Sequence, residues 1–288
     1  MGIRNENSTD YVHNDEPNIL NLHNAMDYNP AGQPIIRTTG DSYSWNINIS
    51  SGSVDGITYI EKFGMNLDVD SNKETIWDAG GIYTYKTTTT TLNVTSDAPT
   101  FDLPGGTGAR NIEVQGLDED YNLVTEVINV GSTGTQPFLR VFRAKVLNAG
   151  SEGVNHGTIN IKCLATNTIL AQIGIDGSGS NAAGRGQTFM ALYTIPAGKT
   201  GYLTQWTVGA GKQNTDAIAF LMLRDLLAPG DGGWNAKDVI TVSATTYSKD
   251  YKIPLQIPEK NDIEVRAYSS TNNSLVSSTF NLILVDNT

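Results

Sequence analysis

Ile159-Asn160-Ile161-Lys162-Cys163 alternates apolar and polar side chains at every position. In an extended strand this spacing places the three apolar side chains on one face and the two polar ones on the other. The stretch therefore predicts a β-strand with one face on a core. It also predicts that Cys163 is a small apolar core side chain rather than a nucleophile.

Similar short alternations, separated by Gly, Asn, Pro and Asp, recur from about residue 57 onward. They lie at 112–114, 123–130, 138–147, 251–257, 263–267 and 280–284, and the continuous apolar run 217–223 is typical of a strand covered on both faces. Because proline cannot donate to a ladder, Pro254 and Pro258 predict that their strand either lies at a sheet edge or ends there. Many short strands without a long helical pattern predict an all-β chain, a β-sandwich of jelly-roll type.

The first 57 residues have a different composition. Residues 1–18 are polar and show no apolar period, residues 19–26 are predicted to form one or two helical turns, and 29–34 break regular structure. We interpret residues 1–57 as an extended N-terminal arm and 58–288 as the sandwich, either single or divided into two near residue 205.

Ordering a polar arm costs about 1–2 kcal/mol per residue, so we expect this one to lie against a partner. The side chains predicted to dock there are the apolar ones of the arm. They are Ile19, Leu20, Leu22, Met26, Tyr28, Ile35 and Ile36.

Charge and length exclude several classes of partner. The 288 residues carry 30 acidic and 19 basic side chains, a formal charge of −11, which argues against nucleic-acid binding. The longest apolar run, 217–223, is far shorter than the ~20 residues of a membrane span. A single Cys cannot form an intrachain disulfide.

Two motifs resemble ligand sites without completing them. Gly198-Lys199-Thr200 has the end of a phosphate-binding loop, but Tyr193 stands where the earlier Gly is required, so we read a turn between strands and expect no cofactor. Asp68, Asp70, Asn72 and Glu74 have the spacing of a calcium loop, but Lys73 and Ala79 replace the Gly and Glu of an EF-hand. They are a weak calcium candidate, or else a solvated acidic turn.

No catalytic pattern is present, and we expect no enzyme activity. The three His residues are His13, His23 and His156, and neither a Gly-x-Ser-x-Gly elbow nor a His-Glu-x-x-His motif occurs. Asp118, Glu119 and Asp120 could serve a glycosidase by composition, but their setting predicts a turn. Trp234, beside a Gly-rich loop, is either an exposed contact or a side chain that covers the sandwich end.

Five stretches of the sequence form a characteristic series along the chain. They are GMNLDVD at 64–70 with TIWDAGGIY at 75–83, GTGAR at 106–110 with VQGLD at 114–118, FLRVFRA at 138–144, YTIPAGKTGYL at 193–203 and IPLQIPEK at 253–260. The series, over residues 58–286, resembles a family of virion structural proteins of tailed bacteriophages from marine and environmental sources. The resemblance implies a structural role in the virion and no catalytic residues.

The resulting hypothesis is a homo-oligomeric head decoration or head-fibre subunit of a phage virion. Residues 1–57 would attach it to other virion proteins, either the major capsid protein or neck and portal-side proteins. The alternatives are a collar, fibre or adaptor protein of the neck or tail, and a module that binds host glycans through aromatics such as Trp234 or Tyr247.

Overall fold

The computed structural model describes residues 26–28, 34–36, 42–177, 183–211, 216–225 and 232–287. The chain divides into two units, Met1–Thr58 and Tyr59–Thr288. As predicted, the regular secondary structure of the described residues is almost entirely antiparallel strand, and their one helix is α3 (Ser42–Ser50). No helix in this part of the chain is long and apolar enough to cross a membrane.

In the N-terminal unit, β1 (Met26–Tyr28) pairs with β2 (Pro34–Ile36). Met26 therefore lies in a strand, and the predicted helical turn does not include it. The helix α3 lies within residues 1–57, which were interpreted as an extended arm, and it was not predicted. The docking candidates Tyr28, Ile35 and Ile36 lie in the two strands, while Ile19, Leu20 and Leu22 lie outside the described residues.

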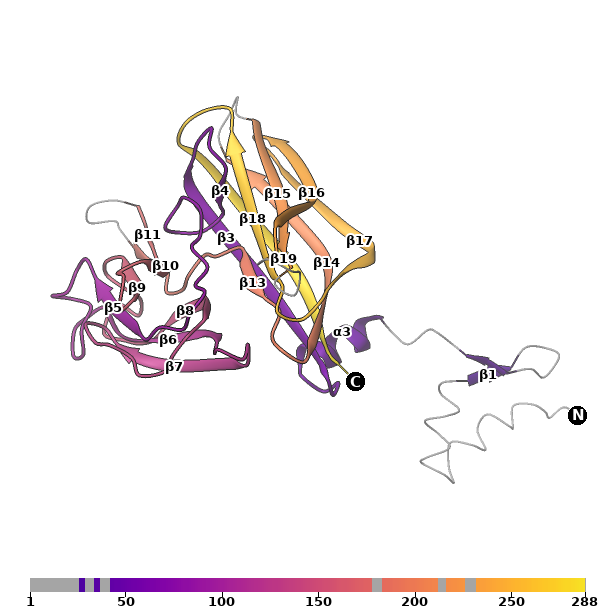
Figure 1. The fold of residues 1–288 in the computed structure, drawn as a ribbon, viewed down its shortest axis with the longest axis horizontal. Helices are drawn as coiled ribbons and strands as arrows, with labels where there is room; N and C mark the ends of the chain where they lie inside the picture. The colour runs from indigo at the N-terminus through magenta and orange to yellow at the C-terminus, as the bar shows by residue number, and fades with distance from the viewer. Residues whose placement is uncertain are drawn as a thin grey trace, which may run out of the picture. The chain divides into compact units, whose positions relative to one another are not determined.

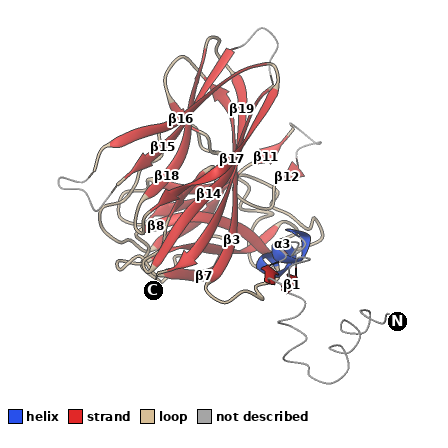
Figure 2. Ribbon diagram, turned by 90° about the vertical axis from the view of Figure 1, so that its right-hand side faces the viewer, coloured by secondary structure: helices blue, strands red, loops and turns tan. Residues whose placement is uncertain are grey.

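The second unit is built on an eight-stranded jelly roll (Figures 1 and 2). Its strands are β3 (Ile57–Val69), β13 (Leu192–Thr194), β14 (Lys199–Ala210), β15 (Asp216–Arg224), β16 (Trp234–Ser243), β17 (Thr246–Ile257), β18 (Asp262–Ser269) and β19 (Ser274–Asp286). One sheet has the order β3-β19-β14-β17 and the other β13-β18-β15-β16. Counted along the chain, these orders are 1-8-3-6 and 2-7-4-5, the connectivity of two Greek keys. The jelly-roll prediction is confirmed.

The jelly-roll core lies between these two sheets. Phe280, Leu282 and Leu284 of β19 and Ile263 and Val265 of β18 are all buried and belong to one hydrophobic cluster. Trp206 is also fully buried, and its Nε1 donates a hydrogen bond to the Ser278 hydroxyl at 3.0 Å. That bond satisfies the only polar atom of the ring, so the large side chain can be buried at little cost.

A smaller sandwich is inserted between β4 (Glu74–Thr75) and β13. One of its sheets has the order β7-β6-β8 and the other β10-β9-β5. The strands are β5 (Leu92–Ser96), β6 (Ala109–Leu117), β7 (Leu123–Asn129), β8 (Arg140–Ala149), β9 (Ile159–Cys163) and β10 (Ile169–Ile173), followed by a hairpin of β11 (Ile175–Asp176) and β12 (Ala183–Gly184). Strand β9 has the predicted bounds and alternation, and Cys163 is buried. No division occurs near residue 205, because that position lies inside β14.

The two chain crossings between the sandwiches run side by side. The Ile76 carbonyl accepts the Ala191 N–H at 2.9 Å, and the Phe189 carbonyl accepts the Asp78 N–H at 3.0 Å. Strands β4 and β13 both pair with β18, at Arg266↔Thr75 and Leu192↔Glu264. The outgoing and returning segments are therefore fixed to the same strand of the jelly roll.

Strand β17 lies at the edge of its sheet, as its prolines predict. The alternation from Tyr251 to Ile257 predicts that Ile253 is buried with the other apolar side chains. This prediction is wrong, because Ile253 is 87% exposed. Between the pairs Leu203↔Leu255 and Gln205↔Asp250 the register shifts, so β17 has extra residues there. This bulge carries Ile253 out of the alternating pattern.

Candidate functional site

A buried polar cluster lies where the two sandwiches meet. Asp262 of β18 is fully buried and faces Arg140 of β8, with Nε–Oδ1 at 3.0 Å and Nη2–Oδ2 at 3.3 Å. Arg224 of β15 binds the same carboxylate at 3.0 Å, and the Thr194 hydroxyl donates to it at 2.5 Å. A carboxylate this deep is stable only with such partners.

A second buried carboxylate, Glu264, continues the cluster along β18. It pairs with Arg266, and its Oε2 accepts from the Thr75 hydroxyl at 3.1 Å and the Tyr85 hydroxyl at 3.4 Å. Burial raises the pKa of Glu264 to about 7, and the Arg266 charge opposes this rise. Glu264 therefore titrates close to neutral pH.

Trp234 belongs to this cluster. Its ring is half-buried and lies 4.5 Å from the Arg266 guanidinium carbon and 5.2 Å from that of Arg224. The Tyr85 ring lies 5.3 Å away. Of the two interpretations of Trp234, this packing matches the side chain that folds back onto the sandwich.

The sequence did not reveal the cluster. Asp262, Glu264 and Arg266 alternate with the core residues Ile263 and Val265, a pattern that assigns the charged face to solvent. The structure covers part of that face with Arg140 and Tyr85. Three charges on one face of a strand would have been the available signal.

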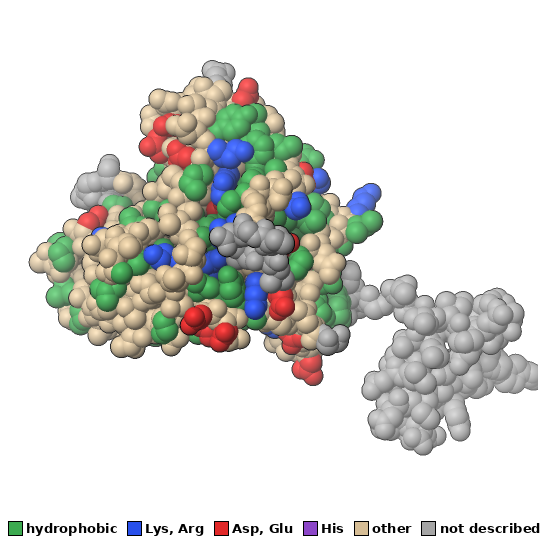
Figure 3. Space-filling view, viewed as in Figure 1, with side chains coloured by type: hydrophobic (Ala, Val, Ile, Leu, Met, Phe, Trp, Pro, Cys, Tyr) green, Lys and Arg blue, Asp and Glu red, His purple; other side chains and the backbone are tan. Residues whose placement is uncertain are grey.

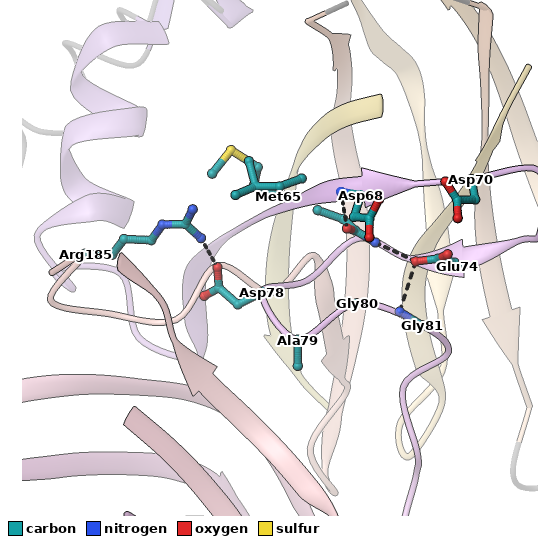
Figure 4. Close-up of a pocket in the computed structure, with 11 residues that line it drawn as sticks. Met65, Asp68, Asp70, Glu74, Asp78, Ala79, Gly80, Gly81 and Arg185 are labelled. Atoms are coloured by element: carbon teal, nitrogen blue, oxygen red, sulfur yellow. Dashed lines mark hydrogen bonds and ion pairs between the residues drawn. The ribbon is translucent and has the colours of Figure 1, made fainter. Parts of the chain in front are cut away.

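Three of the four residues considered for calcium line a cavity of about 460 Å³. Figure 4 shows Asp68, Asp70 and Glu74 toward one end of it and the Asp78–Arg185 pair toward the other. Asn72 is not among the lining residues. The cavity therefore gathers three of the four candidates.

Protein donors already occupy several of these carboxylates. Glu74 Oε2 accepts from the Asn66 amide at 2.9 Å and from the Gly81 N–H at 3.0 Å. Asp70 accepts the Asn273 N–H at 3.1 Å. Over the described residues, no three His, Cys, Asp or Glu side chains are placed to hold a metal ion. The calcium prediction gains no support from this geometry.

Asp78, at the far end of the cavity, holds the crossing segments together. Its Oδ2 accepts the Phe189 N–H at 2.8 Å, and its Oδ1 pairs with the buried Arg185. Burial raises the pKa of Asp78 to about 6, against the Phe189 hydrogen bond and the Arg185 charge. This carboxylate has a structural role at the base of the inserted sandwich.

The remaining candidates are structural where the chain is described. Asp118 Oδ1 accepts the N–H groups of Asp120 at 2.9 Å and Asn122 at 2.8 Å, which is the predicted turn. Gly198 has a φ of 71° in the turn between β13 and β14, and Lys199 pairs with Asp286. His13 and His23 lie outside the described residues.

On the face shown in Figure 3, the positive and negative side chains do not separate into two large areas. Acidic, basic and apolar side chains are interspersed there among neutral polar ones.

No family model matches the chain, and no curated protein matches it. Among solved structures, the infectious bursal disease virus Gx strain is 14% identical with a TM-score of 0.20, over 80% of this chain and 71% of that chain. The VP2 subviral particle of the same virus is 13% identical with a TM-score of 0.20, over 81% and 74%. The strand order, and not this similarity, assigns the jelly roll.

Proposed function

We propose that the protein is a structural protein of a virion, located in the particle and without enzymatic activity. The observation that carries the proposal is the strand order, β3-β19-β14-β17 on β13-β18-β15-β16. Double-sheet jelly rolls of this kind form viral capsid domains. Lectins and cupins share this architecture, so the fold alone does not distinguish a virion protein from them. A test on virus particles does.

More specifically, we propose a homo-oligomeric decoration or fibre subunit of a tailed-phage head. The N-terminal unit supports this idea, because the chain divides after Thr58 and leaves Met1–Thr58 distinct from the body. A separate unit of this length, with a polar leading segment, is suited to docking on the major capsid protein or on neck proteins. Repetition on a lattice would let each contact be modest.

The experiment compares attachment of full-length protein and a variant lacking residues 1–41, which leaves α3 and the jelly roll intact. Both are added to particles that lack the protein, and bound copies are counted by quantitative mass spectrometry. We expect the truncated protein to unfold with an unchanged midpoint and to lose attachment. Equal attachment of both proteins would contradict the proposal.

The copy number separates the head from the neck or tail. Hundreds of copies per particle would indicate the head lattice. About 6, 12 or 18 copies would instead indicate closed rings with the symmetry of the tail. Absence of the protein from purified particles would rule out the virion role altogether.

A further inference from the structure

Two loops of the smaller sandwich form a rigid exposed cluster that the proposed function does not use. One loop joins β5 to β6 and carries Phe101, and the other joins β8 to β9 and carries Glu152 and His156. The rings of Phe101 and His156 stack with centroids 3.9 Å apart and planes 15° apart. Phe101 is nevertheless 43% exposed, so its side chain remains accessible to solvent beside the stack.

Buried Asp102 holds the two loops together beneath this stack. Its carboxylate accepts the N–H groups of Ala109, His156 and Gly157, each at 2.8 Å, and the Ser96 hydroxyl at 2.7 Å. Four bonds to one carboxylate that is 1% exposed fix both loops relative to each other. The cluster above it is therefore preorganised, as a binding site requires.

The Gly-rich stretch 104–108 is shaped by the same packing. A Cβ on Gly108 would lie 2.2 Å from Asp102 Oδ1, and a Cβ on Gly106 would lie 2.0 Å from the Phe101 carbonyl oxygen. These two glycines let the loop approach the cluster closely. Glycine is therefore required at these two positions for packing.

The exposed polar atoms of the cluster are mainly hydrogen-bond acceptors. Glu152 Oε2 lies 2.9 Å from His156 Nδ1, and its Oε1 accepts the Thr107 hydroxyl at 2.7 Å. A carboxylate has about four lone-pair sites, so acceptor capacity remains on Glu152. Because His156 Nδ1 faces this carboxylate, Nδ1 carries a hydrogen, and Nε2 remains available to hydrogen-bond a ligand.

We propose that Phe101, His156 and Glu152 bind a neutral saccharide. The sugar ring lies on the exposed part of the Phe101 ring, whose negative π-face attracts polarised C–H groups. Sugar hydroxyls donate to Glu152 and hydrogen-bond to His156 Nε2. The Glu152 carboxylate repels acidic sugars and thereby selects neutral ones. The proposal does not depend on the virion assignment.

The test is amide NMR of the full chain with neutral oligomers of glucose, galactose, mannose and N-acetylglucosamine, and with a glucuronic acid oligomer. At least one neutral oligomer is expected to shift amides of 101–108 and 150–157, and the acidic oligomer is expected to bind at least about tenfold more weakly. No shift with any neutral oligomer at about 10 mM would overturn the proposal.

Variants separate ring stacking from a general apolar contact. Phe101→Tyr keeps a flat ring and should retain binding, whereas Phe101→Leu should weaken it by about tenfold or more. Glu152→Gln should reduce the preference for neutral over acidic oligomers. Leu123→Ala, at a side chain 55% exposed on β7, is the matched control and should change nothing. Unchanged saccharide binding by Phe101→Leu would contradict the proposed stacking and indicate a general apolar contact.

Discussion

Arg140 and Asp262 lie 122 positions apart in the chain and form a buried two-point ion pair that joins the smaller sandwich to the jelly roll. Because Arg224 shares the same carboxylate, Asp262 neutralises part of two guanidinium charges at once. A pair of this kind adds little net stability compared with apolar packing, but removing one member is costly.

We therefore expect Asp262→Asn to lower the free energy of unfolding by about 3–5 kcal/mol, because it leaves two arginines without their buried counter-charge. Urea unfolding at neutral pH measures the change. Asp286→Asn is the control, since its pair with Lys199 is exposed and should contribute less than about 1 kcal/mol. Equal effects of the two substitutions would contradict the importance of the buried cluster.

Glu264 predicts a pH dependence of stability. Its folded-state pKa of about 7 lies above the ordinary 4.5, so between these pH values the folded state holds a proton that the unfolded state has released. The contribution of Glu264 to the free energy of unfolding is thus fully present below pH 4.5. It is lost as the pH rises to 7, by at most about 1.4 kcal/mol per pH unit. Glu264→Gln should flatten this part of the profile, whereas Glu119→Gln in the exposed turn should leave it unchanged. A parallel profile for Glu264→Gln would rule out the shift.

Lys62 predicts the opposite slope at higher pH. The side chain is buried, its Nζ donates to the Phe142 carbonyl, and burial lowers its pKa to about 7, assisted by the Arg143 charge. Above pH 7 the unfolded state binds the proton that the folded state has released, so stability should rise toward pH 10. Lys62→Met should abolish this rise. Guanidinium unfolding at several pH values between 7 and 10 measures it.

Gly64 of β3 packs closely against the backbone of both crossing segments. A Cβ there would lie 2.3 Å from both the Ala191 nitrogen and the Ile76 oxygen, which are backbone atoms. We expect Gly64→Ala to cost about 1–3 kcal/mol or more, because backbone must shift to admit the methyl group. Gly233→Ala, where the added Cβ meets nothing within 4 Å, should change the melting temperature little.

The β17 bulge can be tested with two isoleucines of equal parity. Ile257 is fully buried and Ile253 is 87% exposed. Ile257→Ala should cost about 2–5 kcal/mol, and Ile253→Ala should change stability by less than about 0.5 kcal/mol. Similar losses of stability at both positions would indicate that Ile253 is as buried as Ile257 and would contradict the bulge.

Prediction from sequence succeeded where one strand face determines the pattern. Strand β9 buries Ile159, Ile161 and Cys163 as its period of two requires, and Pro254 places β17 at a sheet edge. The all-β class and the jelly roll followed from many such segments. These features depend on local spacing and on backbone donors, both of which are visible in one chain.

Prediction failed where long-range packing overrides local spacing. The bulge at Ile253 arises from the register between β17 and β14, which a single strand does not contain. The polar face of β18 is buried by residues from an inserted domain more than a hundred positions away. Likewise, the Phe101–His156 stack depends on Asp102 joining two separate loops.

The smaller sandwich leaves and re-enters the jelly roll through two paired segments on one strand. An insertion whose ends lie this close acts as a cassette: another module with a similar stem could replace it without changing the connectivity of the frame. Evolution could thus diversify the displayed module while the frame that carries it stays constant. The same property makes this chain a scaffold onto which foreign domains could be grafted at residues 76–78 and 189–191.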